Sequence, residues 1–475
     1  MRLVTDDSRV VSSRAIFVVT SMGASYLRAA LEAKPAAVLA GPEHAADAVR
    51  LRDELKTTTV VLEAADLLAA QGRLSSVLHG EPSHHLQITG VTGTNGKTST
   101  AFMLYHIWNE LEIPAALVGT LGVFWRGRAG NEVELQTGYT TPRAGQLQEL
   151  LARMVADGVE QVAMEVSSEA LALGRLEGTR FARAVFTNLT AEHLDAHGSM
   201  DEYFAAKMRL FEMTARDGGD LLIYRAAPGG QRAARFVAGL DTTGRVRLCD
   251  EPLLEPGELA VPAYFHRINA TLALLASGHP EDDPRIRAAL QVLPPIPGRY
   301  TLVRDPDDGG SRYGIVDYAH SPDGLENVLQ AARAEGIRGL ICVFGCGGDR
   351  DAAKRPLMGA IAARLADAII ITDDNPRGED PAAIRAAIRA GIDRELEIRD
   401  PADAPEVFEI GDRRAAIQAA VDWIHAREEL PAVALVAGKG HESVQIFADR
   451  REPFSDALVL EESLRARGNQ VEVVP

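Results

Sequence analysis

The segment at residues 88–99 reads ITGVTGTNGKTS and holds the residue types that bind nucleotide phosphates. Its glycines allow consecutive backbone N–H groups to close around phosphate oxygens, Lys97 supplies a cation, and the Thr98 hydroxyl can bind Mg²⁺. The usual loop has a glycine five residues before Gly96, where this chain has Val91. The segment is therefore a variant phosphate loop of the form TGTNGKT, and a chance glycine-rich turn is the weaker interpretation.

A second group of reactive side chains follows later in the chain. Glu165 and Ser167 lie at the end of the apolar run at residues 161–166, where a carboxylate is a natural Mg²⁺ ligand opposite a phosphate loop. His193 and Lys207 follow downstream. Taken alone, Glu165 is equally well explained as a cap of the next helix, and a single histidine or lysine is more often structural or solvated.

The elements around the loop have the order that such a site needs. Residues 86–91 form an apolar run that predicts a strand, and residues 97–111 carry the apolar spacing of a largely buried helix. Further apolar runs at 161–166 and 184–186 end in polar residues, as parallel strands do where a ligand binds beyond their C-terminal ends. The sequence therefore predicts a central P-loop-type mononucleotide-binding α/β domain.

A further α/β domain is predicted on each side of the central one. Residues 1–85 mix short β-branched runs with alanine-rich segments and end in a polar, turn-rich stretch. The proline cluster at 293–298 indicates a second linker, and beyond it apolar runs alternate with alanine-rich segments. We expect a small N-terminal domain at residues 1–85, the ATP-binding domain at 86–297 and a Rossmann-like domain at 298–475.

Net charge, cysteine count and the lack of long apolar runs exclude several classes of protein. The 475 residues carry a formal net charge of −17, which argues against nucleic-acid or anionic-membrane partners, because both need a dominant basic field. The three cysteines are too few for a disulfide framework or a four-ligand zinc site. Asp6 and Asp7 stand where a signal peptide has its apolar core, and no run of about 18 apolar residues occurs. We therefore expect a cytoplasmic monomer that acts on small molecules.

A series of motifs between residues 7 and 445 resembles those of the Mur ligases. They are TGTNGKT (92–98), TTP (140–142), MEVSS (164–168), ALGR (172–175), TNLT..H (187–193), AAK (205–207), PGR (297–299), DYAHSPDGLENVL (317–329), FGCGGDRD..KRPLM (344–358), DNPR (374–377) and AGKGHE (437–442). Because the motifs are spread over nearly the whole chain, the resemblance is specific.

This resemblance implies an ATP-dependent amide ligase of peptidoglycan precursor synthesis. Such an enzyme would add meso-2,6-diaminopimelate to UDP-N-acetylmuramoyl-L-alanyl-D-glutamate. ATP would phosphorylate the free carboxylate of the nucleotide dipeptide, and the amine of the incoming amino acid would then attack the acyl phosphate. An arginine can hold a carboxylate through two N–H donors, so Arg377 favours diaminopimelate over lysine, which lacks the second carboxylate.

Matching motif positions imply a set of site residues. Catalytic roles fall on Lys97, Glu165, His193 and Lys207. ATP would contact Gly93, Thr94, Asn95, Gly96, Lys97, Thr98, Ser99, Asn269, Arg299, Asp317 and His320. Mg²⁺ would be bound by Thr98, Glu165, His193 and Lys207, the last as a carbamate. The UDP-linked substrate would contact Ser8, Thr140, Thr141, Ser167 and Arg175. The amino acid would contact Arg350, Asp374, Asn375, Pro376, Arg377, Gly438 and Glu442.

Three positions depart from the family pattern and leave alternatives open. Glu169 stands where a histidine is usual, Glu192 where an aspartate is usual, and His266 where an asparagine is usual. A divergent ligase that joins another carboxylate and amine, such as lysine or the substrates of folylpolyglutamate synthases, is one alternative. A non-catalytic ATP-binding relative is another. A nicotinamide-binding protein is excluded, because Arg350 occupies the place of the last glycine after Gly345.

Overall fold

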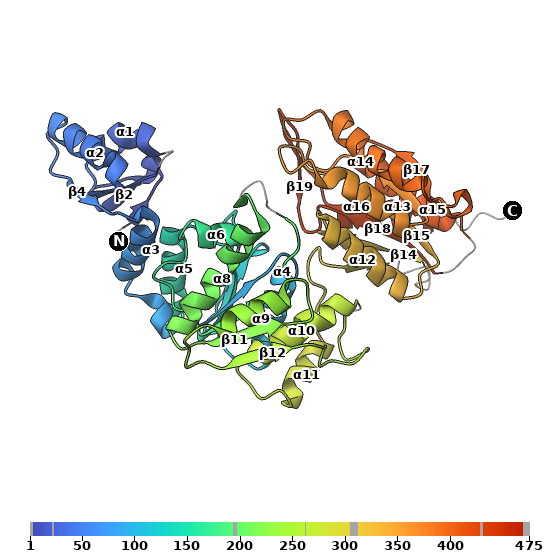
Figure 1. Cartoon of the computed structure of the whole chain (residues 1–475), viewed down its shortest axis with the longest axis horizontal. Coiled ribbons are helices and arrows are strands. Elements are labelled where there is room, and N and C mark those ends of the chain that lie inside the picture. The colour runs from blue at the N-terminus through green and yellow to red at the C-terminus, as the bar shows by residue number, and fades with distance from the viewer. Residues whose placement is uncertain are drawn as a thin grey trace. The chain divides into compact units, whose positions relative to one another are not determined.

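The computed structural model describes residues 3–20, 23–192, 197–261, 263–304, 312–427 and 431–468 (Figure 1). The chain divides into two compact units. The first comprises residues 1–189, 198–252 and 270–290, and the second comprises residues 190–197, 253–269 and 291–475. Within the described ranges, no helix is both long and apolar enough to cross a membrane.

The first unit begins with a small parallel sheet of order β1-β2-β3-β4. Its strands are β1 (Leu3–Thr5), β2 (Ala15–Val19), β3 (Ala37–Ala40) and β4 (Val60–Glu63). The accompanying helices are η1 (Ser8–Val10), η2 (Gly23–Tyr26), α1 (Leu27–Glu32), α2 (Pro42–Glu54), α3 (Leu67–Leu78) and η3 (Pro82–His85). Every residue of β2 and β3 is buried, since apolar side chains of α1 and α2 pack against the sheet.

An eight-stranded sheet forms the rest of the first unit, in the order β12-β11-β10-β5-β9-β6-β7-β8. Its strands are β5 (Gln87–Thr92), β6 (Ala115–Gly119), β7 (Gly122–Arg126), β8 (Glu132–Leu135), β9 (Gln161–Glu165), β10 (Arg183–Phe186), β11 (Asp220–Tyr224) and β12 (Val246–Cys249). The strands from β12 to β6 are parallel, whereas β7 and β8 add an antiparallel edge.

Helices of this unit surround the sheet (Figure 1). They are α4 (Lys97–Glu110), α5 (Ala144–Ala156), α6 (Ser168–Ala172), α8 (Met200–Arg216), α9 (Gly230–Ala238) and α11 (Pro284–Gln291), while α10 (Tyr264–Ala276) runs from the second unit into the first. The register of β5 against β9 brings part of the candidate site together, because Val91 in β5 lies opposite Glu165 in β9. The strand that leads into the phosphate loop therefore has the Glu165 carboxylate beside it.

The second unit has a six-stranded sheet of order β13-β14-β18-β15-β16-β17. Its strands are β13 (Thr301–Arg304), β14 (Arg312–Asp317), β15 (Gly339–Phe344), β16 (Ala368–Ile371), β17 (Glu406–Glu409) and β18 (Ala432–Ala437), and β19 (Val444–Ile446) pairs with β20 (Arg451–Pro453). Its helices are α12 (Pro322–Ala334), α13 (Lys354–Leu365), α14 (Pro381–Leu396), η4 (Pro401–Asp403), α15 (Arg413–His425) and α16 (Asp456–Gly468). Only β13 is antiparallel to its neighbour in this sheet.

The predicted α/β class, with a phosphate-loop sheet and a second sheet of Rossmann type, is confirmed. Both sheets are mixed rather than purely parallel, which the apolar runs did not indicate. The elements that sequence patterning missed include β8, with the sequence EVEL, and β17, with the sequence EVFE. Both are short strands at a sheet edge, and none of their residues is fully buried, so they have no apolar run. The domain boundaries at 85/86 and 297/298 stay predictions.

Candidate active site

The phosphate loop joins β5 to α4, and its conformation requires glycine. Gly93 has φ of +153° and Gly96 has φ of +85°. A Cβ atom at position 93 would lie 1.8 Å from Oγ1 of Thr187. The Nζ atom of Lys97 donates hydrogen bonds to the carbonyl oxygens of Gly93 (2.9 Å) and Thr94 (2.7 Å). The loop is thus already folded into a tight turn at the N-terminus of a long helix.

Asn188 holds this loop from the neighbouring strand end, a contact that sequence analysis did not predict. Its carbonyl oxygen accepts a hydrogen bond from the backbone N–H of Thr94 (3.0 Å), and its Oδ1 accepts one from the N–H of Asn95 (2.9 Å). Thr187 Oγ1 donates to the carbonyl oxygen of Asn95 (2.6 Å). The TNLT motif at residues 187–190 is the sequence signal that points to this asparagine.

Two predicted Mg²⁺ ligands lie next to each other. Thr98 Oγ1 donates a hydrogen bond to Glu165 Oε2 (2.9 Å), and both side chains are buried. Thr120, which sequence analysis missed, donates from its N–H to Oε1 (2.8 Å) and from its hydroxyl to Oε2 (3.1 Å) of the same carboxylate. A hydroxyl and a carboxylate are hard oxygen donors of the kind that Mg²⁺ selects. The third predicted protein ligand, His193, lies outside the described residues.

Lys207 of α8 reaches the same loop. Its side chain is only 1% exposed, and Nζ donates a hydrogen bond to the carbonyl oxygen of Gly93 (2.8 Å). The Nζ atom also lies 4.2 Å from the centroid of the Tyr203 ring, and the Tyr203 hydroxyl is 3.2 Å from Thr94 Oγ1. Within the described ranges, no group of three or more His, Cys, Asp or Glu side chains is placed to hold a metal.

The residues predicted for the UDP-linked substrate lie beside Glu165, with one exception. Thr141 Oγ1 donates to the carbonyl oxygen of Glu165 (2.9 Å) and accepts from the N–H of Ser167 (3.1 Å). The Thr140 hydroxyl lies 3.0 Å from that of Thr120. Ser8 is in η1, and none of the contacts found among the described residues joins it to this group.

Arg175 is the cation of this group, and Glu169 is its ion-pair partner. The two side chains are 2.7 Å apart, with Arg175 15% exposed and Glu169 63% exposed. Arg175 Nη1 also donates to the carbonyl oxygen of Thr141 (3.3 Å). The unusual residue at position 169 therefore supplies a carboxylate to the arginine that we predicted to bind an anionic substrate.

A second polar cluster forms in the second unit, where the DNPR segment follows β16. Asp374 and Asn375 are buried, and Asn375 Nδ2 donates to Glu442 Oε2 (2.8 Å). A Cβ atom at Gly438, which has φ of +117°, would lie 3.0 Å from Asp374 Oδ2. The structure thus brings together predicted amino-acid contacts that are more than sixty positions apart in the sequence.

Arg377 of the same segment has a left-handed backbone with φ of +51°. Its N–H donates to the carbonyl oxygen of Ile446 (3.1 Å), and Nη1 donates to that of Gly348 (2.8 Å). Such a backbone is costly for a residue other than glycine and persists where surrounding contacts enforce it. Arg350 is exposed and donates to the carbonyl oxygen of Asp349 (3.0 Å), and Pro376 is buried.

The remaining predicted nucleotide contacts lie in the second unit around Asp317. Its carboxylate accepts hydrogen bonds from the N–H groups of Tyr300 and Ala319, both at 2.7 Å, and burial raises its pKa. The Arg299 guanidinium lies 4.3 Å from the Tyr318 ring centroid. Two further predicted residues are placed separately: Asn269 is buried, and His320 Nε2 lies 3.2 Å from Glu192 Oε1.

His266, the third departure from the family pattern, is completely buried. Its ring centroid lies 4.7 Å from that of Phe265 and 6.4 Å from that of Tyr300. Burial away from water lowers the pKa of His266 to about 3, so the imidazole is neutral at pH 7.

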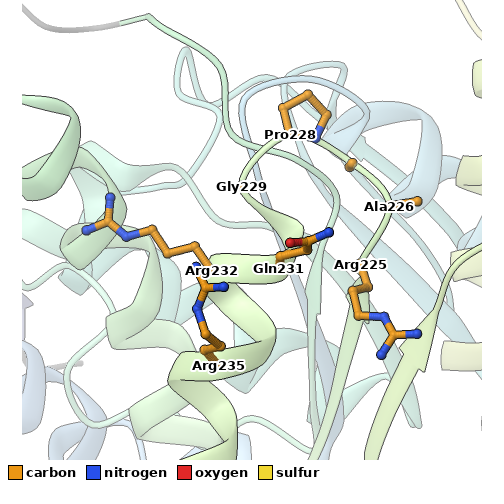
Figure 2. A pocket seen from close by; sticks show the side chains of 8 residues that line it. Arg225, Ala226, Pro228, Gly229, Gln231, Arg232 and Arg235 are labelled. Atoms are coloured by element: carbon orange, nitrogen blue, oxygen red, sulfur yellow. The ribbon is translucent and has the colours of Figure 1, made fainter.

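An arginine-rich pocket of about 480 Å³ opens where β11 ends and α9 begins (Figure 2). None of the predicted site residues lines it. Arg225 pairs with Asp250, Arg232 pairs with Asp201 (2.8 Å), and Figure 2 shows these two arginines pointing away from each other. Two of the three arginines that line the pocket are thus already in ion pairs and do not converge on a common point.

Sequence profiles match both parts of the chain that carry these clusters. The profile of the Mur ligase middle domain matches residues 91–236, and that of the Mur ligase, glutamate ligase domain matches residues 298–440. The protein of Caulobacter vibrioides named UDP-N-acetylmuramoyl-L-alanyl-D-glutamate--2,6-diaminopimelate ligase is 38% identical over 480 residues, which are 95% of this chain and 93% of that protein. The chain belongs to the Mur ligase family.

Two more comparisons agree with this assignment. The protein of the same name from Thermosynechococcus vestitus is 40% identical to this Mur ligase over 435 residues, covering 86% of this chain and 83% of the relative. A solved structure titled as that ligase is 26% identical and superposes with a TM-score of 0.64, covering 98% of this chain and 95% of the other. The predicted family is confirmed.

Proposed function

We propose that this chain joins meso-2,6-diaminopimelate to UDP-N-acetylmuramoyl-L-alanyl-D-glutamate, with ATP converted to ADP and phosphate, in the synthesis of peptidoglycan precursors. The relatives that carry this activity in their names cover nearly the whole chain at 38% to 40% identity. The observation that carries the assignment is that the chain pairs a complete phosphate loop with a separate cluster of charged side chains, Asp374, Arg377 and Glu442, suited to a diamino diacid. Because ATP and UDP-linked precursors are cytoplasmic metabolites, we expect the reaction to take place in the cytoplasm.

The phosphate loop and its neighbours would serve the first step, the transfer of the γ-phosphoryl group to the substrate carboxylate. Backbone N–H groups at the N-terminus of α4 and the Lys97 ammonium would hold the ATP phosphates. Thr98 and Glu165 would hold Mg²⁺, together with His193. Bound there, the metal would neutralise phosphate charge and so reduce its repulsion of the incoming carboxylate.

Lys207 is proposed to act as a carbamate. Addition of CO₂ to its neutral amine would form an N–C bond, release one proton and leave an anionic oxygen donor in place of a cation. The position of Lys207 supports this proposal, because its side chain is buried and its Nζ atom lies 2.8 Å from the carbonyl oxygen of Gly93 in the phosphate loop.

The UDP-linked substrate is proposed to bind beside Glu165. Thr141 is joined by hydrogen bonds to Glu165 and Ser167, and the Thr140 hydroxyl contacts that of Thr120, which itself donates to Glu165. Arg175 offers a cation to the substrate carboxylate or diphosphate. Ser8 would contact the uridine side.

The charged cluster of the second unit would bind the amino acid. Arg377 and Arg350 offer guanidinium groups to the distal carboxylate, and a carboxylate such as Glu442 offers oxygen to the distal ammonium. Asp374, Asn375 and Gly438 would complete the pocket. Lysine would leave the arginines without a carboxylate partner, which favours diaminopimelate.

A phosphate-release panel tests this function. The protein is incubated with ATP, Mg²⁺ and the nucleotide dipeptide, and with diaminopimelate, lysine or ornithine as the amine. We expect phosphate release and a tripeptide product with diaminopimelate only. Release with lysine but not diaminopimelate would overturn the amino-acid assignment, and ATP binding without release in any mixture would favour a non-catalytic relative.

A further inference from the structure

Lys439, between the two glycines of the GKG segment, is a fully buried lysine that no prediction used. Its Nζ atom donates three hydrogen bonds, to Asn375 Oδ1 (3.0 Å), Glu442 Oε2 (3.1 Å) and the carbonyl oxygen of Val444 (2.8 Å). A lysine ammonium has three N–H donors, so each donor has a partner. The side chain therefore ties together three segments, the DNPR segment after β16, the loop after β18, and β19.

The backbone around Lys439 is fixed by close packing. Gly438 has φ of +117° and Gly440 has φ of +53°, so both adopt conformations that favour glycine. A Cβ atom at position 440 would lie 2.7 Å from that of Tyr318. The chain must therefore turn at both flanking positions, and the lysine between them is held inside the cluster.

The negative charge of nearby carboxylates explains why a cation lies at position 439. Two carboxylates surround the ammonium, Glu442 in hydrogen-bond contact and Asp374 with Oδ1 at 3.9 Å. The other buried cation nearby, Arg413, forms a two-bond ion pair with Asp456 in which both distances are 2.7 Å. Lys439 therefore offsets part of the negative charge of the Asp374 and Glu442 carboxylates, because burying a carboxylate such as Asp374 without a nearby cation is costly.

The hydrogen bonds also distinguish the two oxygens of Glu442. Oε2 accepts from both Lys439 Nζ and Asn375 Nδ2 (2.8 Å). Among the hydrogen bonds found in the described part of the chain, none involves Oε1. Glu442 is 31% exposed, so it is the carboxylate of the cluster that a ligand can reach. An incoming ammonium would therefore meet a carboxylate that is already oriented through its other oxygen.

We propose that Lys439 is a positioning residue for the amino-acid substrate: it fixes Glu442 through Oε2 and leaves Oε1 to accept the substrate ammonium. This inference rests on the proposed function. It assigns Lys439 no contact with the substrate, and its effect is confined to the amino acid, because its partners all belong to the second cluster.

Steady-state kinetics of Lys439→Met test this role, with Lys56→Met as the matched control at an exposed lysine. We expect Lys439→Met to raise KM for diaminopimelate about 10- to 100-fold, the loss typical of a hydrogen bond to a charged group. We expect KM for ATP and for the nucleotide dipeptide to stay within about twofold of the wild type. Equal rises in all three KM values would overturn the proposal, since they would indicate a general structural role.

A double-mutant cycle with Glu442→Gln shows whether Lys439 acts through Glu442. Because Lys439 only orients that carboxylate, the double variant should bind diaminopimelate no more weakly than the weaker single variant. If the increases in KM for diaminopimelate in the two single variants multiply in the double variant, the proposal is overturned. Lys439→Gln serves as a second variant if Lys439→Met does not fold, since it keeps an N–H donor. If neither folds, Lys439 is a structural residue and the proposal fails.

The two hypotheses fail in different ways. Use of diaminopimelate by the wild-type protein tests the proposed function. The ratio of KM values between the Lys439 variants and the wild type, measured with whichever amine the wild type uses, tests the positioning role.

Discussion

Each of the two clusters contains a buried lysine, and the partners of these lysines differ in kind. Lys207 of the first unit donates to a main-chain carbonyl of the phosphate loop and lies over the ring of Tyr203. Lys439 of the second unit donates to a carboxylate, a side-chain amide and a carbonyl. The first site is thus shaped mainly by the backbone of a glycine loop. The second is shaped by charged side chains that hold one another.

This difference teaches which property each site can recognise. Backbone N–H groups at a helix N-terminus suit any nucleotide phosphate, because they offer geometry and partial charge rather than a side-chain pattern. Paired carboxylates and guanidinium groups distinguish ligands by the number and spacing of their charges. We therefore expect substitutions in the first cluster to reduce the chemical step, and substitutions in the second to change amino-acid use.

The largest effect should come from Lys207. Lys207→Ala should lower kcat by at least about 10³-fold, at the upper end of what the loss of one transition-state charge partner costs. Lys207→Arg should lose as much, because a guanidinium keeps the positive charge but does not form the carbamate. Phosphate release is measured with and without added bicarbonate in CO₂-depleted buffer, and the wild type alone should respond. Near-normal turnover of Lys207→Arg would contradict the carbamate.

The second-largest effect should come from Arg377→Ala, which should raise KM for diaminopimelate about 10- to 100-fold and leave KM for ATP unchanged. The reason is the loss of a charge-assisted contact to the distal carboxylate. Because the backbone at 377 has φ of +51°, Arg377→Gly is the matched control: it removes the same side chain without strain. Both variants should show the same KM. If KM for diaminopimelate rose in Arg377→Ala but not in Arg377→Gly, backbone strain would be the cause. Side-chain charge would then not explain recognition at the second cluster.

The variant His266→Asn tests whether burial of this histidine in the second unit makes the free energy of unfolding depend on pH. The folded pKa of His266 is lowered to about 3, whereas an unfolded histidine has a pKa of about 6.5. Between these values the unfolded state binds the extra proton, so the stability is intact above pH 6.5 and falls as the pH drops toward 3. From pH 7.5 to 5.5 the wild type should lose about 1.4 kcal/mol of unfolding free energy that His266→Asn does not lose.

Urea unfolding at the two pH values measures this difference. Other groups, such as His441 with its pKa lowered to about 4, titrate in both proteins and cancel in the comparison. Identical pH dependence in the two proteins would mean that His266 is not held neutral by burial.

The smallest effect should be that of Glu169→Gln. Removing this carboxylate frees Arg175 from an ion pair whose acidic partner is 63% exposed, and such pairs contribute about 0.2–1 kcal/mol. KM for the nucleotide dipeptide should therefore fall by about 1.5- to 5-fold, while KM for diaminopimelate stays constant. Initial-rate kinetics with both substrates check this. A rise in KM for the nucleotide dipeptide would show that the ion pair orients Arg175 for binding.

The sequence by itself determined the phosphate loop, the alternation of strands and helices, and the local motifs that contribute residues to each cluster. Gly93, Gly96 and Lys97 could be assigned because the loop conformation depends on neighbouring residues: glycine permits the positive φ, and the helix starts immediately after it. The DNPR and GKGHE segments were likewise visible as short local motifs, as was the strand that precedes each one.

Only the tertiary structure decided which side chains meet. Thr120 and Asn188 were not predicted, because no local pattern specifies which strands pair. Thr120 reaches Glu165 because β6 pairs with β9, and Asn188 reaches the phosphate loop because β10 pairs with β5. Lys439 belongs to the AGKGHE motif but has no predicted role, and its proposed role follows from its burial beside Asn375, 64 positions away. Glycine conformation is a property of a few adjacent residues, whereas the charge balance of a buried cluster exists only once distant segments are packed together.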